Sequence, residues 1–355
     1  MITIVVGAQY GGEGKGKVCA YLSYAQHFDI ACRCGGPNSS HSVLHGGQLF
    51  KLRMMPAAAV HNRNIDVFFG AGTLLHVPTL LQEMALLQFR GRLLVDPKAG
   101  VINEDIVAEQ RRDDRYAAIG STLTGTGLAS ALRAQRKLPL AADTDTLRPF
   151  LGDVSAELWR SLARRNILVE GHQGFGLSNY HGDYPYTSSR DSTASAMLSE
   201  LGIGPPGRNL LRVVLAVKAF PTRNHAGSLS EELNAQDADA LGIAEFGGGA
   251  WGIPDRRRRV GLFDMDLFSR AIMANAPSEI ALTGADYIDH TLRGTHSARR
   301  SEPLEEFIAR LEQVSGVRVR YVSTGPDTTS MFERRRSHQP SKRSTPGEPD
   351  LFSRN

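Results

Sequence analysis

Short apolar runs alternate with longer amphipathic stretches along most of the chain. Residues 2–6 (ITIVV) form a continuous β-branched run, which is typical of a strand buried on both faces of a sheet. Further strands are predicted at residues 66–69, 92–95, 166–170, 211–217, 279–282 and 317–322. Helices are predicted at residues 15–27, 78–90, 104–116, 155–164, 191–201, 229–241 and 302–314. Strands that alternate with helices predict an α/β fold with a mainly parallel central sheet and flanking helices.

The pattern changes near residue 333. From there to residue 355 the chain is rich in Arg, Ser, Pro and Gly and has few apolar residues. A segment of this composition cannot bury enough apolar surface to fold. We therefore expect one folded domain over residues 1–332 and a basic, disordered tail over residues 333–355.

The composition is that of a globular protein, with 41% apolar and 22% charged residues. No apolar run reaches the length of a membrane span, and the first residues lack the basic region of a signal peptide. The cysteines Cys19, Cys32 and Cys34 are odd in number and fit structural thiols in a reducing compartment. We expect a cytoplasmic protein with no membrane partner.

The net charge of +4 is unevenly distributed. Basic residues gather at 256–259, 298–300 and 333–343. Such runs are either solvated faces or sites for an anionic ligand, and no recognisable nucleic-acid module accompanies them. We expect no specific nucleic acid, although a tail that binds nucleic acid stays open as an alternative.

Residues 7–18, GAQYGGEGKGKV, lie between the first strand and the first helix. Gly11, Gly16 and Lys17 fit the phosphate-loop spacing G-x-x-x-x-G-K. Backbone N–H groups at such a turn and at the helix N-terminus bind phosphate oxygens. Val18 stands where the usual motif has the Ser or Thr that holds Mg²⁺. The stretch predicts a phosphate-binding loop, related to those of P-loop NTPases, whose metal is held elsewhere.

Residues 9–17, Q-Y-G-G-E-G-K-G-K, resemble the N-terminal signature Q-W-G-D-E-G-K-G-K of the adenylosuccinate synthetases. Further segments resemble motifs of the same family in the same order; they are residues 34–43, 124–127, 169–189, 214–223, 255–264 and 323–326. In the third of these, EGHQG resembles the family's E-G-A-Q-G.

The resemblance implies a carbon–nitrogen ligase that depends on GTP and Mg²⁺ and forms a homodimer. The family first phosphorylates O6 of a purine nucleotide, and the amino group of L-aspartate then displaces the phosphate. His41 matches the histidine that hydrogen-bonds O6, a role suited to a near-neutral pKa. With His41, Lys17 and Gln173 form the catalytic set that the resemblance implies.

The resemblance also implies the binding residues. Those for the triphosphate are Gly11, Gly12, Glu13, Gly14, Lys15, Gly16, Lys17, Asp286, Gly325 and Pro326. Those for the purine monophosphate are Gly12, Asn38, Ser39, Ser40, Thr124, Arg136, Gln173 and Thr187. Arg256 and Arg258 match the clamp on the aspartate carboxylates, and the Ser40 backbone matches the ligand to Mg²⁺. Either Arg136 or Lys137 corresponds to the arginine that one family subunit inserts into the other.

Gly12 departs from the family, whose catalytic aspartate accepts the N1 proton and helps to bind Mg²⁺. Loss of this side chain removes a negative charge and opens room for the 2-amino group of a guanine. We therefore predict dGMP or GMP as substrate and a 2-amino-succinyladenylate as product, a precursor of 2,6-diaminopurine (base Z) deoxynucleotides. This resembles the phage-encoded branch of the family, which would act in the host cytoplasm. Solvent, substrate phosphate and Glu13 are the candidates to take the N1 proton.

A second departure lies in residues 283–286, where T-G-A-D replaces the family's T-K-x-D. Without the lysine stem, ATP, dATP and GTP are all open as phosphate donors. Two other functions are also open: an ordinary adenylosuccinate synthetase that uses IMP, and a non-catalytic nucleotide-binding relative.

Overall fold

The computed structural model describes residues 1–355 apart from 208, 225, 244–258, 298–300 and 335–355. The strands of its main sheet are β1 (Ile2–Gly7), β2 (Ile30–Arg33), β5 (Asp66–Phe69), β7 (Leu93–Val95), β9 (Ile167–Glu170), β10 (Leu211–Lys218), β13 (Glu279–Thr283), β14 (Val319–Ser323) and β15 (Met331–Glu333). Three smaller pairs are β3 (His41–His45) with β4 (Gln48–Leu52), β6 (Leu74–Leu75) with β8 (Gly100–Val101), and β11 (Thr222–Arg223) with β12 (Arg259–Val260). The helices are α1 (Lys15–Ala25), α2 (Val77–Leu86), α3 (Glu104–Arg112), α4 (Asp114–Ala118), α5 (Thr126–Ala134), α6 (Val154–Ser161), α7 (Ala194–Leu201), α8 (Ala235–Ala240), α9 (Met265–Asn275), α10 (Ala285–Ile288) and α11 (Glu302–Ser315).

The main sheet has nine strands in the order β15-β14-β13-β10-β1-β9-β2-β5-β7. All neighbouring strands are parallel except β14 and β15, which are antiparallel. β1 lies at the centre, paired with β10 on one side and β9 on the other. The predicted α/β fold with a mainly parallel sheet is therefore confirmed.

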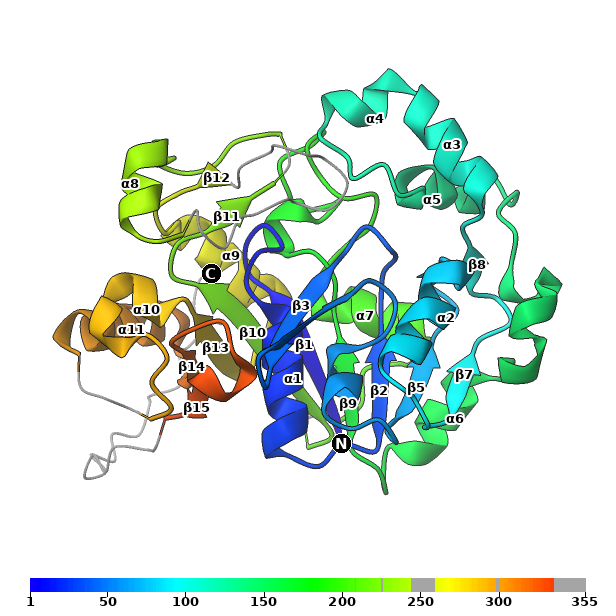
Figure 1. Ribbon diagram of the computed structural model, residues 1–355, viewed down its shortest axis with the longest axis horizontal. Helices are drawn as coiled ribbons and strands as arrows, with labels where there is room; N and C mark the ends of the chain where they lie inside the picture. Colours follow the sequence, from blue (N-terminus) through cyan, green and yellow to red (C-terminus); the bar gives the residue numbers. More distant parts are fainter. Residues whose placement is uncertain (208, 225, 244–258, 298–300, 335–355) are drawn as a thin grey trace, which may run out of the picture.

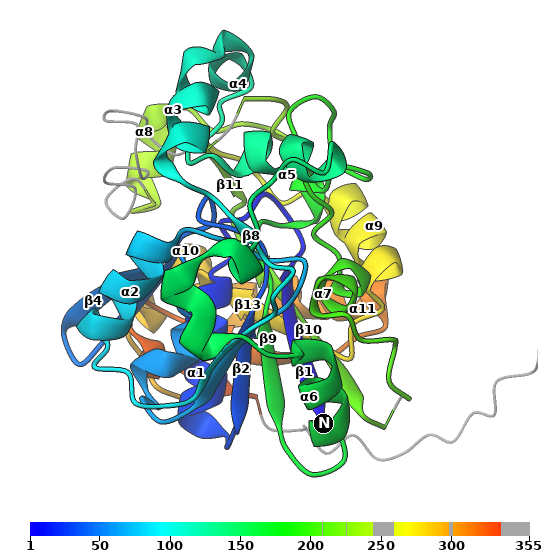
Figure 2. The same cartoon turned by 90° about the vertical axis from the view of Figure 1, so that its right-hand side faces the viewer.

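The sheet is covered on both faces, which explains the unbroken apolar run in β1. Successive side chains of a strand point to opposite faces, so Ile4 belongs to one hydrophobic cluster and Val5 to the other. Helices α6, α7, α9 and α11 supply the first cluster, and α1 and α2 supply the second. Figure 2 shows these two groups of helices on either side of the sheet.

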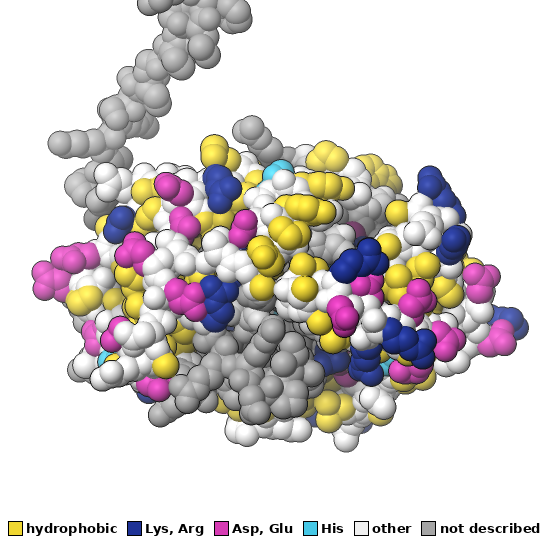
Figure 3. Space-filling model, turned by 90° about the horizontal axis from the view of Figure 1, so that it is seen from above, with side chains coloured by type: hydrophobic (Ala, Val, Ile, Leu, Met, Phe, Trp, Pro, Cys, Tyr) yellow, Lys and Arg dark blue, Asp and Glu magenta, His cyan; other side chains and the backbone are white. Residues whose placement is uncertain are grey.

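The smaller elements gather at one edge of the sheet. Figure 1 shows β1 running upward from the N-terminus, with α3, α4, α5, α8, β11 and β12 above its carboxyl end. Ligands of open parallel sheets bind at this edge, where the loops that follow the strands converge. Figure 3 looks onto it and shows positive and negative side chains interspersed over the described surface.

Several predicted helices are shorter than expected. The predicted helix 104–116 is two helices, because Asp113 is extended and its carboxylate caps α4 by accepting from the Arg115 N–H. Only Ala235–Ala240 of the stretch 229–241 is helical, and the helix predicted from 191 begins at Ala194, where Thr193 caps it. The pattern missed β2, the β3–β4 hairpin, α5 and α9.

The predicted tail begins slightly too early. Glu333 belongs to β15 and pairs with Tyr321, and the Arg334 N–H donates to the Arg320 carbonyl at 2.8 Å. Arg334 also forms an ion pair with Glu312 at 2.9 Å. These two residues therefore belong to the folded body, and the rest of the predicted tail lies outside the described residues.

Cys19, Cys32 and Cys34 are buried free thiols, and burial raises the pKa of each. Among the described residues, we find no helix with both the length and the apolar character that crossing a membrane requires.

Candidate active site

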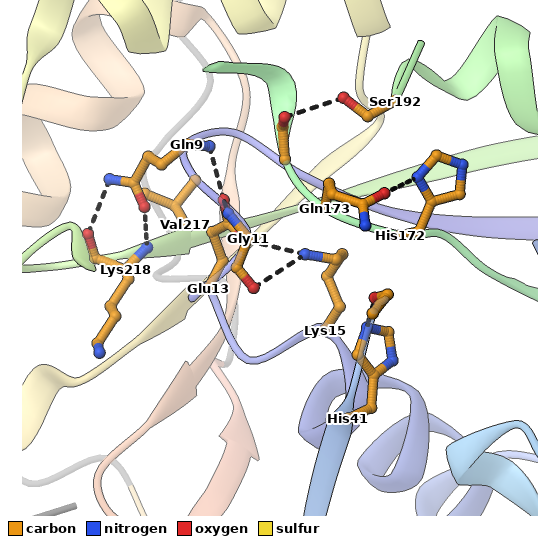
Figure 4. A network of polar contacts seen from close by, with 12 residues as sticks. Gln9, Gly11, Glu13, Lys15, His41, His172, Gln173, Ser192, Val217 and Lys218 are labelled. Carbon is orange, nitrogen blue, oxygen red and sulfur yellow. Dashed lines mark hydrogen bonds and ion pairs between the residues drawn. The ribbon is translucent and has the colours of Figure 1, made fainter. Parts of the chain in front are cut away.

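The loop between β1 and α1 is organised around the buried Glu13. Its carboxylate accepts hydrogen bonds from the Gln9 N–H at 2.8 Å and the Gly11 N–H at 2.9 Å, and it pairs with Lys15 at 2.8 Å. Gly11 and Gly14 have φ of 94° and 78°, the left-handed conformation that glycine adopts without strain. Figure 4 shows the loop wrapped around this carboxylate. Glu13 thus fixes the loop and has little capacity left to accept the N1 proton.

Lys17 joins the loop to the segment after β14. Its ammonium donates to the Ser323 hydroxyl and to the Gly325 carbonyl. Burial lowers the pKa of Lys17 to about 7, although the carboxylates of Asp286 and Asp327 oppose this shift. The structure therefore brings together Lys17, Asp286 and Gly325, three residues of the predicted triphosphate set.

His41 lies directly against the start of α1. A Cβ added to Gly16 would lie 2.5 Å from the His41 Cβ, so this close approach requires glycine. The His41 Nδ1 contacts both the Glu170 carboxylate and the Arg33 guanidinium, and its Nε2 lies 3.3 Å from the Ser39 hydroxyl. All four side chains are buried.

Arg33 and Glu170 were not among the predicted residues. They lie opposite each other in the register of β2 and β9, at the carboxyl ends of the two strands, and form a buried ion pair. Glu170 also accepts from the Ala57 N–H at 2.7 Å. The sequence signal that could have identified them is a charged residue at the end of each of these two apolar strands, because a buried charge needs a partner.

The pKa of His41 differs from the near-neutral value that was expected. Burial, followed by the nearby Arg33 charge, lowers it to about 4, while Glu170 acts in the opposite direction. The ring is therefore neutral at pH 7 in this structure. A ring that accepts from Arg33 at Nδ1 carries its proton on Nε2, and a ring that donates from Nδ1 to Glu170 has a bare Nε2.

A pocket of about 590 Å³ is lined in part by Asn38, three residues before His41 in the sequence. It lies between α5, the segment around α4 and the residues that follow β9. Asn38, Gln173 and Thr187, which were predicted to bind the purine monophosphate, all line it. Three distant stretches of sequence thus supply polar groups to one pocket.

Gly12 lies next to this region but does not leave a gap. A Cβ added to Gly12 would lie 2.1 Å from the Thr222 Oγ1, so the Thr222 hydroxyl occupies the space that was predicted to be empty. The neighbouring Gly11 packs near the Gln173 backbone, where an added Cβ would lie 3.5 Å from the Gln173 Cα. The prediction of an empty space beside Gly12 is therefore wrong. The absence of a negatively charged side chain at this position is a fact of the sequence.

Comparison with known proteins decides the family. A family model described as adenylosuccinate synthetase matches residues 4–143 and 138–293. The adenylosuccinate synthetase of Methanocaldococcus jannaschii is 41% identical over 332 residues, which cover 92% of this chain and 94% of that protein. The chain belongs to the adenylosuccinate synthetase family. The enzyme of Archaeoglobus fulgidus is 36% identical over 338 residues, covering 94% of this chain and 98% of that protein.

Two solved structures share the fold of this adenylosuccinate synthetase family member. Fully ligated adenylosuccinate synthetase from Plasmodium falciparum matches with a TM-score of 0.83 and 20% identity, covering 94% of this chain and 99% of that one. Cyanophage S-2L succinoaminodeoxyadenylate synthetase, solved bound to dGMP and dATP as an energy donor, matches with a TM-score of 0.78 and 24% identity. The latter match covers 94% of this chain and 95% of that one.

Membership of the adenylosuccinate synthetase family makes the chain a carbon–nitrogen ligase that acts on small molecules, and Mg²⁺ is the metal of this family. In the described part of the chain, no three His, Cys, Asp or Glu side chains gather as a metal site. The buried Ser40 hydroxyl has no hydrogen-bond partner there, and its backbone carbonyl is the predicted ligand. The hydroxyl and carbonyl oxygens of Ser40 fit a hard cation such as Mg²⁺, whose other ligands would be phosphate and water oxygens.

The remaining residues of the predicted sites lie around the pocket or apart from it. The Thr124 hydroxyl is within 3.2 Å and 3.4 Å of those of Thr122 and Thr126, both of which line the pocket. Arg136 is exposed at the end of α5, donates to the Ala134 carbonyl and does not line the pocket. Pro326 is exposed beside Gly325, and Arg256 and Arg258 lie outside the described residues.

Proposed function

We propose that the protein condenses dGMP, or GMP, with L-aspartate at the expense of a purine nucleoside triphosphate. The γ-phosphoryl group moves to O6 of the guanine, and the amino nitrogen of aspartate then attacks C6 as inorganic phosphate leaves. The product is (2′-deoxy)-2-amino-N6-succinyladenylate, a precursor of 2,6-diaminopurine deoxynucleotides. The setting would be the cytoplasm, that of the host cell if the gene belongs to a phage.

The observation that carries this proposal is the absence of a negatively charged side chain at Gly12. The family's aspartate would stand here with a negative charge, and the structure has instead the Thr222 hydroxyl against a glycine backbone. The Thr222 hydroxyl is an uncharged group that accepts as well as donates hydrogen bonds, and the Lys218 ammonium lies 3.5 Å from its oxygen. The Thr222 hydroxyl therefore suits the 2-amino group of a guanine.

The comparisons leave two substrates to be separated. The archaeal relatives carry the name adenylosuccinate synthetase, and this name supports IMP as the substrate of this chain. The cyanophage structure is bound to dGMP. Both solved structures are less than 25% identical to this chain, so they support the fold and not the substrate. Gly12 is the feature that makes us favour the guanine nucleotide.

We assign a proposed role to each group of the candidate site. His41, neutral at pH 7, donates from Nε2 to O6 when Arg33 occupies its Nδ1. Lys17 and the loop N–H groups bind the triphosphate, and an arriving triphosphate raises the pKa of Lys17 by adding negative charge. Ser40 would help to hold Mg²⁺, which would supply neutralisation of the charge on the phosphates.

The loss of the family's lysine leaves the donor base open between adenine and guanine. Gly284 takes the place of the family's lysine, with φ of 72°, and a Cβ there would lie 2.8 Å from the Tyr287 ring. A lysine cannot be placed at this position without moving Tyr287. Asp286, buried next to it, remains able to accept from a base amine, which both adenine and guanine carry.

Purified protein assayed with dGMP, GMP and IMP in parallel tests the proposal. Each reaction contains L-aspartate, Mg²⁺ and ATP, dATP or GTP, and both phosphate release and the succinylated product are measured. We expect turnover with dGMP or GMP. Turnover with IMP alone identifies an ordinary adenylosuccinate synthetase, and no phosphate release with any combination identifies a non-catalytic relative.

A further inference from the structure

His172 is a buried imidazole that no step of the proposed reaction uses. It has no exposed surface and lies between Gln173 and the last turn of α7. Its Nδ1 contacts the Gln173 Oε1, and its Nε2 lies 3.0 Å from the Glu200 Oε1. Figure 4 shows the Gln173 carbonyl oxygen directed at the ring and the amide nitrogen on the side away from it.

The ring is held in place from its other side as well. A Cβ added to Gly35, which has φ of 90°, would lie 2.6 Å from the His172 Cδ2. The Gly35 N–H donates to the second oxygen of Glu200 at 2.8 Å. Since the imidazole and its carboxylate are both fixed, the ring has little freedom to avoid the Gln173 amide.

The chemistry of the two contacts links the protonation of His172 to the direction of the Gln173 amide. A protonated ring donates from both nitrogens, one to Glu200 and the other to the Gln173 Oε1. A neutral ring that keeps its proton on Nε2 for Glu200 has only an acceptor at Nδ1. The Gln173 amide must then turn and present its NH₂ group to the ring, because two acceptors in contact repel each other.

The opposite neutral tautomer is unfavourable, because it places a bare nitrogen against the Glu200 carboxylate. Three charged groups face this corner of the protein. Glu200 lies on α7, Arg190 pairs with it at 3.3 Å from the preceding segment, and Arg133 reaches in from α5. Burial alone would raise the pKa of Glu200, but Arg190 and His172 outweigh it, so the carboxylate stays ionised.

We propose that His172 is a positioning residue that sets which end of the Gln173 amide faces the purine pocket, and so selects 6-oxopurine over 6-aminopurine nucleotides. This rests on the proposed placement of the purine against Gln173, which lines the pocket. With Oε1 turned to His172, the amide NH₂ faces the pocket and donates to O6 or N7 of a 6-oxopurine. With the amide reversed, its carbonyl faces the pocket, repels O6 and accepts from a 6-amino group.

The test measures dissociation constants for dGMP, IMP and dAMP by calorimetry from about pH 5 to pH 9, the range in which histidines titrate. His172→Ala removes the donor, and His172→Asn supplies a donor at the position of Nδ1 that does not titrate. His27→Asn is the matched control, because His27 is an exposed imidazole paired with a carboxylate, Asp29, at 3.1 Å. Thermal unfolding of each variant checks that the fold is retained.

In the unaltered protein we expect the preference for 6-oxopurines over dAMP to fall as the pH rises. His172→Ala should lower this preference about tenfold at pH 6, the effect of one hydrogen bond. His172→Asn should restore the preference and remove its pH dependence, and His27→Asn should change neither. The proposal is overturned if His172→Ala keeps the full preference, or if His172→Asn keeps the pH profile of the unaltered protein.

This test is separate from that of the guanine substrate. Both dGMP and IMP are 6-oxopurines, so the comparison with dAMP can be made with whichever of them binds. If IMP proves to be the substrate, the proposed function fails and the role of His172 is still measured. If dGMP is the substrate and His172→Ala has no effect, only the role of His172 fails.

Discussion

The phosphate loop and the proposed purine pocket are adjacent but are built differently. In the loop, Glu13, Lys15 and Lys17 all have partners within the protein before any nucleotide arrives. In the pocket, Asn38 and Thr187 line a space of about 590 Å³ to which several segments contribute. The loop is thus one stretch of sequence whose charged side chains are held by partners in the protein, and the pocket is an assembly of distant groups.

The difference indicates that recognition of phosphate and recognition of the base have separate structural origins. A cradle of backbone N–H groups recognises phosphate, a feature common to every nucleotide. A purine is recognised by the hydrogen bonds on its edges, and we propose that Thr222 and Gln173 supply some of them here. A loop motif can therefore be retained while the base that the enzyme accepts changes.

The largest expected effect concerns the buried ion pair of Arg33 and Glu170 beside His41. Glu170→Gln leaves the buried Arg33 without its carboxylate and removes the charge that faces His41. Removing one partner of a buried pair costs about 3–5 kcal/mol of unfolding free energy. Urea unfolding measures this loss, and a change below about 1 kcal/mol would show that the pair contributes no more than an exposed one.

Gly12→Asp is expected to change the substrate preference. The carboxylate restores the charge of the family at this position and must displace the Thr222 hydroxyl. We expect the ratio of kcat/KM for dGMP to that for IMP to fall by about 10- to 100-fold, equivalent to about 1.4–2.8 kcal/mol. Gly12→Ala is the matched control, because it displaces Thr222 without adding charge.

If Gly12→Ala lowers the ratio as much as Gly12→Asp, the effect is steric and the argument from charge is wrong. A rise in dGMP turnover with Gly12→Asp would contradict the assignment of guanine altogether.

A smaller effect is expected from the pH dependence of stability. The pKa of Lys17 is about 7 in the folded protein and 10.5 when unperturbed, because burial disfavours its charge. Between these values the unfolded chain binds more protons, so Lys17 makes the unfolding free energy rise with pH, by up to about 1.4 kcal/mol per unit. Urea unfolding at pH 7.5 and 9 should show this slope, and Lys17→Met should reduce it. An unchanged slope in Lys17→Met would place the burial of this charge in doubt.

The smallest effect is expected from removing residues 335–355, which follow Arg334, the last residue that the structure describes. We expect unchanged turnover and no DNA binding in a gel-shift assay, with or without the tail. Loss of DNA binding on truncation would instead give the basic tail a nucleic-acid partner.

Much of the fold could be predicted from the sequence, since each of the seven apolar runs falls on a strand of the main sheet. Strands that are buried on both faces of a sheet are continuously apolar, so these runs could be recognised as strands from their composition alone. The hairpin from His41 to Leu52 was missed because its outward positions are polar and it is short. α5 was missed because it is nine residues long and follows a glycine-rich turn.

The candidate site could be predicted only where function follows from a local motif. The loop and His41 are recognisable in the sequence, and so was the missing charge at Gly12. The filling of the Gly12 space by Thr222 could not be predicted, because these residues meet only through the packing of β11 against the loop. For the same reason, no local pattern shows that His172 reaches both Gln173 and Glu200.

The central claim is that the protein prefers a guanine because a neutral hydroxyl, not a carboxylate, faces the pyrimidine edge of the purine. Calorimetric titration of the unaltered protein with dGMP and with IMP, each in the presence of Mg²⁺ and a non-hydrolysable ATP analogue, tests it most directly. The account predicts that dGMP binds at least about tenfold more tightly than IMP, a difference of about 1.4 kcal/mol. Tighter binding of IMP would contradict it.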